Sequence, residues 1–223
     1  MSRTARASRG NYCYHVLNRG NARSTVFQGD DDYQEFVDLL GEASLFREMR
    51  VLAYCLMPDH FHLVLRPIHD GDLSSWMQWL ATAHVRRYHR RHESSGHVWQ
   101  GRFKAFPIQE DEHLTAILRY VEGNPLRSKL VDRSQDWYWS SLNRPAAAAE
   151  NAVRLDSGPV PRGNGWTNRV NRPMPGAELA AIRQCVVRGA PFGTDAWSRK
   201  TAVALGLEAS LRPRGRPRTR PAD

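Results

Sequence analysis

The stretch Met57–Pro67, which reads MPDHFHLVLRP, decides the fold that we expect for this chain. Apolar and polar side chains alternate along it, which is typical of a β-strand, because successive strand residues point to opposite faces. His60 and His62 therefore share one face, about 7 Å apart along the backbone. The preceding run, residues 50–56, is also strand-like, so the two runs predict a β-hairpin that turns at residues 58–59.

Two imidazoles on one face of a strand can hold a single metal ion from one side. The alternative is that His60 and His62 are two ordinary histidines of the core or surface. The pattern of this strand alone leaves both interpretations open.

Length and composition bound the remaining possibilities. A chain of 223 residues with 41% hydrophobic residues is expected to form one domain, with room for an appendage. We expect no membrane span and no signal peptide, and three widely spaced cysteines suit a reducing interior, so a cytoplasmic location is expected. The net charge of +9 and the pI of about 10.0 favour a polyanionic partner, although many cytoplasmic proteins are simply basic.

Outward from the hairpin, the pattern predicts strands and helices in a fixed order. A first strand is expected over 11–18 and another in the second half of 97–108, and helical spacing is found over 30–46, 73–92 and 110–123. This order predicts an α+β fold, an antiparallel sheet covered by helices.

The C-terminal third differs in composition from the rest. Residues 143–176 are rich in Ala, Pro, Gly and Asn and are interpreted as a linker or loose wrap, and two short helices are expected at 177–188 and 195–207. We therefore divide the chain into a main domain (1–142), this linker (143–176) and a small helical, basic extension (177–223).

The helix over 110–123 carries a second set of candidate residues. Tyr120 and Asn124 are four residues apart and would share one face if the helix continued. A tyrosine can act as a covalent nucleophile, and an asparagine carbonyl is a ligand for Mg²⁺ or Mn²⁺. Together with His60 and His62 they would form a metal-assisted phosphoryl-transfer site. Glu122 is an alternative ligand because Pro125 disfavours helical geometry at Asn124, and Tyr120 could also be a core tyrosine.

Four segments of the sequence resemble the signature blocks of one family. They are residues 15–21 (HVLNRGN), 54–65 (YCLMPDHFHLVL), 96–104 (GHVWQGRFK) and 119–127 (RYVEGNPLR). In this order they resemble the REP-associated tyrosine transposases, a bacterial branch of the single-tyrosine HUH endonucleases. The resemblance covers about the first 140 residues, and the four blocks together are far more specific than any one of them.

This resemblance implies a role for each candidate residue. His60 and His62 match the paired metal ligands, Tyr120 the nucleophile and Asn124 the third ligand, with Mg²⁺ or Mn²⁺ as the cofactor. Gly123 departs from the family pattern, in which a larger apolar residue is usual, and could loosen the end of the Tyr120 helix. The implied fold is a ferredoxin-like sheet with helices on one face. The implied activity is nicking and rejoining of single-stranded DNA beside a palindromic hairpin, through a 5′-phosphotyrosine intermediate.

Two groups of cations are expected to contact DNA. The first group lies near strand ends and comprises Arg19, Arg102 and Lys104. The second lies in the motif 213–218 (PRGRPR), which resembles an AT-hook, and comprises Arg214, Arg216 and Arg218. A plain solvated basic tail would have the same composition.

A second function of another class is a catalytically silent hairpin-DNA-binding protein or regulator derived from such a transposase. The presence of His60, His62 and Tyr120 argues against it, because these side chains would be free to change in a silent protein. In either case the expected partner is single-stranded or hairpin DNA, at the nucleoid.

Overall fold

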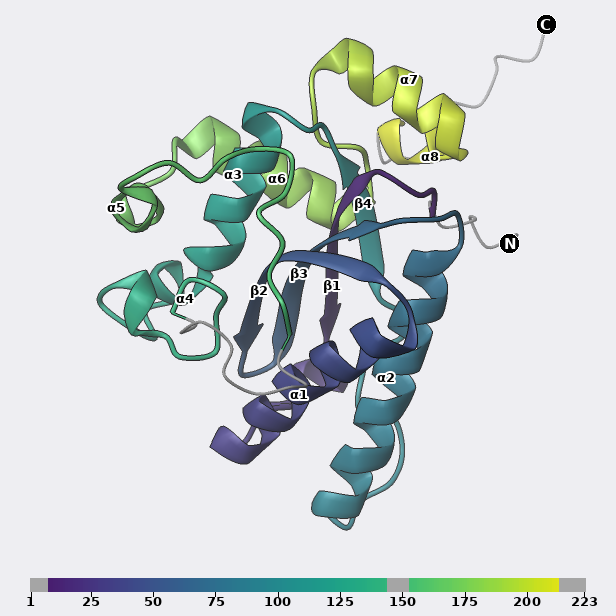
Figure 1. Cartoon of the computed structure of the whole chain (residues 1–223), viewed down its shortest axis with the longest axis vertical. Helices are drawn as coiled ribbons and strands as arrows, with labels where there is room; N and C mark the ends of the chain where they lie inside the picture. Colours follow the sequence, from purple (N-terminus) through teal and green to yellow (C-terminus); the bar gives the residue numbers. More distant parts are fainter. Residues whose placement is uncertain (1–7, 144–152, 213–223) are drawn as a thin grey trace, which may run out of the picture.

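The computed structural model of the chain describes residues 8–143 and 153–212. The tail motif with Arg214, Arg216 and Arg218 lies outside the described residues. At the centre is a four-stranded sheet (Figure 1), made of β1 (Cys13–Arg19), β2 (Met49–Met57), β3 (His60–Pro67) and β4 (Lys104–Ile108).

The strands lie in the order β2-β3-β1-β4, and every neighbouring pair is antiparallel. This is the ferredoxin-like arrangement, and it confirms the predicted α+β fold. The hairpin between β2 and β3 turns at Pro58 and Asp59, as expected from the sequence. The register places His60 opposite Arg19 and His62 opposite Leu17 on β1.

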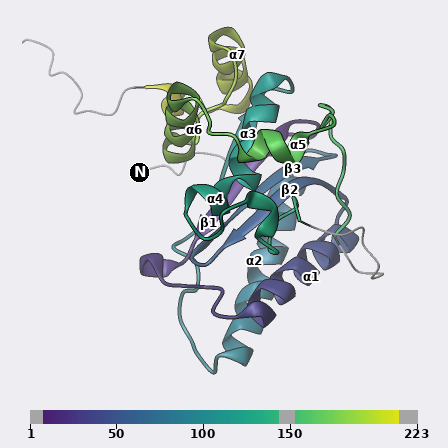
Figure 2. The same ribbon diagram turned by 90° about the vertical axis from the view of Figure 1, so that its left-hand side faces the viewer.

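One face of the sheet is covered by α1 (Asp30–Phe46) and α2 (Asp72–Arg91) (Figures 1 and 2). α1 has the bounds predicted from its spacing, because three aspartates at its start suit the helix dipole and its apolar residues recur on one side. Phe36 and Trp76, both fully buried, anchor these helices in a core with the alternate strand residues Phe61 and Leu63.

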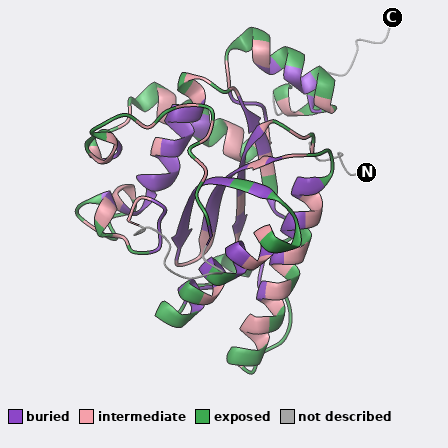
Figure 3. Ribbon diagram, in the orientation of Figure 1, coloured by how far each residue is buried: buried purple, intermediate pink, exposed green. Residues whose placement is uncertain are grey.

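The opposite face is covered by α3 (Glu112–Glu122) and α6 (Gly176–Arg188). The expectation that the helices lie on one face is therefore wrong, because they cover both. The physical reason is that the other alternate set of strand residues is also apolar and needs cover; it includes Cys13, Ala53, Val64, Phe106 and Ile108. Figure 3 shows the strands buried between the two layers.

The remaining helices are short or lie at the periphery of the sheet. They are α4 (Asn124–Arg127), α5 (Trp166–Asn171), α7 (Asp195–Leu205) and α8 (Glu208–Leu211), with 3-10 turns at Asn21–Arg23 and Ser134–Asp136. Among the helices that the structure describes, none has both the length and the apolar character needed to cross a bilayer.

Later parts of the chain protect both edges of the sheet. Backbone hydrogen bonds join edge strand β2 to Trp139, Ser141 and Asp156, and join β4 and the residue after it to Phe192. Since an open edge would offer unpaired backbone groups to other chains, this cover satisfies edge groups within the chain itself. The division of the chain into three parts stays a prediction.

Candidate active site

The two histidines of β3 lie side by side on the α3 face of the sheet. The ring centroids of His60 and His62 are 4.9 Å apart, and the ring planes are nearly perpendicular, at 89°. His62 is buried, whereas the His60 side chain keeps 13% of its surface exposed. The alternation of the strand therefore brings two imidazoles to one place at the edge of the buried layer.

Each of these imidazoles uses its Nδ1 atom in a hydrogen bond. His60 Nδ1 lies 2.5 Å from the Oδ1 atom of Asp59, and His62 Nδ1 lies 2.8 Å from the Nε2 atom of His15. Neither Nε2 atom has a hydrogen-bond partner in the described parts of the chain. If the protons sit on Nδ1, both Nε2 lone pairs are available to a metal ion.

His15 is a functional candidate that the sequence reasoning missed, although it lies in the first signature block. It is fully buried on β1, and its own Nδ1 has no partner within the described residues. Only the pairing of β1 with β3 brings it to His62. The contact joins residues 47 positions apart, so no local spacing could indicate it.

The environment keeps these rings uncharged. Burial lowers the pKa of His15 to about 3 and lowers that of His62 well below its usual value. The pKa of His60 is also lowered by burial, and the hydrogen bond to Asp59 acts against that change. Neutral imidazole is the form that coordinates metal ions.

Tyr120 projects from the last turn of α3 toward the histidines. Its ring centroid lies 5.7 Å from that of His62 and 5.9 Å from that of His15, both in edge-on arrangements. The residue is 8% exposed. Its hydroxyl forms no hydrogen bond within the described residues, and it is not among the fully buried polar atoms that lack a partner there.

Arg127 is a second residue that the sequence reasoning missed. Its guanidinium lies over the Tyr120 ring, 4.5 Å from the centroid, and donates hydrogen bonds to the Tyr120 carbonyl and, at 3.3 Å, to Asn124 Oδ1. Burial lowers the pKa of Arg127 to about 10, so it remains a cation at neutral pH. It is the last residue of the fourth signature block, 119–127, and this membership is the signal that could have found it.

Gly123 makes this arrangement possible by its small size. A Cβ atom at this position would lie 2.8 Å from the Arg119 carbonyl oxygen and 2.8 Å from a guanidinium nitrogen of Arg127. The absence of a side chain at Gly123 thus leaves room for Arg127 to lie over the Tyr120 ring. α3 ends at Glu122, immediately before this glycine, and α4 begins at Asn124.

The two alternative oxygen ligands have different surroundings. Asn124 is buried, its Oδ1 has only the long bond to Arg127, and its Nδ2 has no partner within the described residues. Glu122 is fully buried, and both its carboxylate oxygens are occupied; the donors are Ser141 Oγ at 2.6 Å, Arg162 at 3.2 Å and Trp166 Nε1 at 2.6 Å. Glu122 thus ties the later chain to α3.

The candidate DNA-contacting cations lie at the same end of the sheet. Arg19 is 3.5 Å from Asp59, the carboxylate that also holds His60. Arg102 and Lys104 are exposed and form no ion pair within the described residues. The nearby aromatic residues are almost completely buried; they are Trp99, Phe103 and Phe106.

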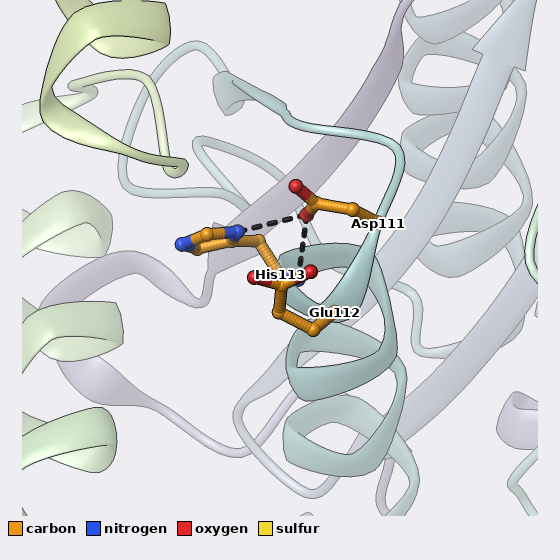
Figure 4. A group of neighbouring side chains, drawn as sticks. All are labelled: Asp111, Glu112 and His113. Carbon is orange, nitrogen blue, oxygen red and sulfur yellow. Dashed lines mark hydrogen bonds and ion pairs between the residues drawn. The ribbon is translucent and has the colours of Figure 1, made fainter.

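A separate group, Asp111, Glu112 and His113, places three possible ligand atoms close together (Figure 4). Hydrogen bonds within the helix terminus explain this geometry. Asp111 is the N-cap of α3 and accepts from the His113 backbone N–H at 2.9 Å, and its Oδ1 lies 2.8 Å from His113 Nδ1. This is an ordinary helix cap.

Comparison with known proteins shows the family of the chain. The sequence model of a family described as "Transposase IS200 like" matches residues 8–124, more than half of the chain. A relative from Haemophilus influenzae, named "Putative REP-associated tyrosine transposase", is 30% identical over 150 residues, which cover 62% of this chain and 83% of the relative. The chain belongs to the REP-associated, IS200-like transposases.

A solved structure supports the fold of this transposase family member. The structure of a REP-associated tyrosine transposase bound to a REP hairpin matches with a TM-score of 0.54 and 18% identity, covering 70% of this chain and all of the other. At this identity the match shows a common fold.

Proposed function

We propose that this transposase is a metal-dependent, single-strand DNA endonuclease and strand transferase that acts beside palindromic hairpins, with Tyr120 as its nucleophile. The observation that carries the proposal is the contact of the Tyr120 ring with the His62 ring, 5.7 Å between centroids, while the phenol hydroxyl has no hydrogen-bond partner within the described residues. A tyrosine with only a structural role would not need an unbonded hydroxyl beside a histidine pair.

The donor set fits a divalent cation such as Mg²⁺ or Mn²⁺. His60 and His62 would each supply Nε2, and Asn124, whose amide is under-satisfied, would supply its oxygen. Glu122 is the weaker candidate because both its oxygens are already occupied. A cation bound here would polarise the scissile phosphate and offset its negative charge.

The side chains around Tyr120 suit an in-line displacement at phosphorus. The phenol oxygen would form a bond to phosphorus and lose its proton to solvent. The bond from phosphorus to the 3′ oxygen would break, and that oxygen would take a proton, leaving a 5′-phosphotyrosine and a free 3′-OH. Arg127, stacked on the ring, would stabilise the developing phenolate and the phosphate charge. Attack by the 3′-OH on the phosphotyrosine would rejoin a strand.

The DNA is proposed to lie across the end of β1 and β3. Arg19, Arg102 and Lys104 would contact phosphates there, and the tail with Arg214, Arg216 and Arg218 would bind the hairpin stem or its base. The structural relative bound to a REP hairpin supports a hairpin as the substrate. A DNA substrate of this kind would place the protein at the nucleoid.

Covalent capture tests the proposal directly. A hairpin oligonucleotide with a single-stranded flank, taken from palindromic repeats near the gene and labelled on its 3′ side, is incubated with Mn²⁺ or Mg²⁺ and separated under denaturing conditions. Wild-type protein should carry the label, whereas Tyr120→Phe, His60→Ala with His62→Ala, and wild-type protein with EDTA should not.

The same experiment separates the alternatives. Hairpin binding by the wild type without any adduct, under both metals, would favour the catalytically silent DNA-binding protein. An adduct that persists in Tyr120→Phe would move the nucleophile to another residue. An Asn124→Ala variant that is less active than Glu122→Gln would support Asn124 as the third ligand.

A further inference from the structure

A groove on the α2 side of the molecule lies on the face of the sheet opposite His60, His62 and Tyr120, and shares only Arg102 with the residues assigned above. This groove, which we call the α2 groove, lies between α2 and the loop of residues 96–103. Its volume is about 1030 Å³. Ligand sites in proteins commonly have volumes of about 300 to 1,000 Å³, so the groove can hold more than one base-sized group.

The groove begins next to the proposed metal site. Its loop is held to the end of β1 by the bonds from Gln100 N–H to the Arg19 carbonyl and from Asn21 N–H to the Val98 carbonyl, both 2.8 Å. Asn18 lines the groove, while Arg19, the next residue, pairs with Asp59 beside His60. Neighbouring strand residues point to opposite faces of a sheet. The α2 groove and the proposed metal site therefore lie on opposite faces at the end of β1.

The walls of the groove combine apolar surface with positive charge. Met77 and Val85 of α2 and Trp99 of the loop line it, together with Arg86 and Arg102, whose side chains are exposed. Both arginines lack an ion-pair partner in the described parts of the chain, and none of the residues that line the groove is acidic. This composition complements a ligand with flat apolar faces and negative charges.

Trp99 forms part of the groove wall and is 6% exposed. Its ring also packs against Phe61 and His84, each 5.1 Å away between centroids, which fixes the position of this part of the wall. Aromatic side chains are surfaces on which unpaired bases commonly stack.

We propose that the α2 groove binds unpaired nucleotides of the single strand that flanks the hairpin, with bases against the apolar walls and phosphates at Arg86 and Arg102. The proposal rests on the proposed function, because it assigns a path to that enzyme's DNA: from the Tyr120 site, round the end of β1, into the groove. Such a site would hold the scissile strand in register while its phosphate lies at Tyr120.

Another aromatic surface lies where the end of α1 meets α2. Phe46 and Trp79 stack on each other with centroids 5.7 Å apart, and the guanidinium of Arg47 lies 6.0 Å from the Phe46 centroid while pairing with Asp72. This surface is smaller, at about 650 Å³, and is lined by both Arg86 and Arg90, so it serves as the competing location in the test.

Binding is measured in the Tyr120→Phe background, so that no cleavage intervenes, with a fluorescent single strand of about twelve thymidines. Ala81→Trp, which fills the groove, and Arg86→Ala, which removes a cation that lines it, should each weaken binding about fivefold or more. Arg90→Ala removes an exposed cation of the same helix that does not line the groove, and should change the affinity less than about twofold. The slope of the logarithm of the binding constant against the logarithm of the salt concentration should become less steep by about 0.7 for Arg86→Ala only.

Photo-crosslinking tests binding of the single strand in the α2 groove even if one of these variants fails to fold. With iododeoxyuridine in the single strand, the protein with otherwise native groove residues should crosslink within residues 96–103. Equal effects of Arg86→Ala and Arg90→Ala, or crosslinks confined to Phe46 and Trp79, would overturn the proposal. Crosslinking in the groove without any Tyr120 adduct in the wild type would contradict only the proposed enzymatic activity, whereas an adduct without groove binding would contradict only the groove.

Discussion

Buried histidines lie on both faces of the sheet, and their surroundings differ. On the α1–α2 face, His84 is 2% exposed among aromatic rings, with Phe36 and Trp99 each 5.1 Å away between centroids, and its Nδ1 has no partner within the described residues. On the α3 face, His62 is hydrogen-bonded to His15, and its other nitrogen is open. Burial lowers the pKa in both places. A lowered pKa alone therefore does not identify a site; the connection to other polar groups and to solvent does.

The first test of this comparison removes a core side chain from the α1–α2 face. Phe36→Ala removes a fully buried ring and should lower the free energy of unfolding by about 3 to 5 kcal/mol, because the core cannot close the cavity. Urea unfolding at neutral pH measures it. Below the unfolding transition, the variant should still nick DNA at a rate close to that of the wild type. A loss of nicking in fully folded variant protein would contradict the separation of the two faces.

A substitution on the α3 face should instead lower the rate of nicking. His62→Ala should slow nicking of a labelled hairpin about a thousandfold, because it would remove a proposed metal ligand, and a bound metal ion contributes several kcal/mol to stabilising the transition state. The matched control, His84→Leu, should nick within about twofold of the wild-type rate. Similar losses in the two variants would show that both histidines act only through the fold.

The acid sensitivity of the protein should depend on His84. Its pKa in the folded state is about 3, below the ordinary value of 6.5, so the unfolded chain takes up the proton first. The contribution of His84 to the free energy of unfolding is therefore fully present above pH 6.5 and decreases as the pH falls below that value. His84→Leu should recover about 2 kcal/mol of unfolding free energy at about pH 5 relative to neutral pH. An unchanged pH dependence in urea unfolding would show that His84 is protonated in the folded protein.

The smallest effect is expected at the cap of α3. Asp111→Ala should lower the free energy of unfolding by about 1 kcal/mol, since the first turn loses its side-chain acceptor. Mn²⁺ binding, measured by calorimetry, should be unchanged. A weakened Mn²⁺ affinity would instead make the group of Asp111, Glu112 and His113 a metal site.

Local patterns were sufficient to predict most of the fold. The helix over 30–46 has its predicted bounds because its acidic start and its apolar spacing agree, and the hairpin turn follows from Pro58 and Asp59. The faces of the sheet were harder to predict. Whether helices cover one face or both depends on where α3 packs, and this is a tertiary contact.

The site was predictable only in part, for the same reason. The proximity of His60 and His62 follows from strand alternation, and the position of Tyr120 next to them comes from the packing of α3. His15 reaches His62 only through the pairing of β1 with β3, and Arg127 reaches Tyr120 only because Gly123 leaves space. Contacts of this kind leave no trace in local spacing.

The most direct measurement is the chemical identity of the residue that becomes attached to DNA. After reaction with the labelled hairpin and Mn²⁺, nuclease and trypsin digestion followed by mass spectrometry should find a nucleotide phosphate on the peptide of residues 120–127, YVEGNPLR, at Tyr120. Attachment at any other tyrosine, or an unmodified peptide in protein that has nicked its substrate, would contradict the account.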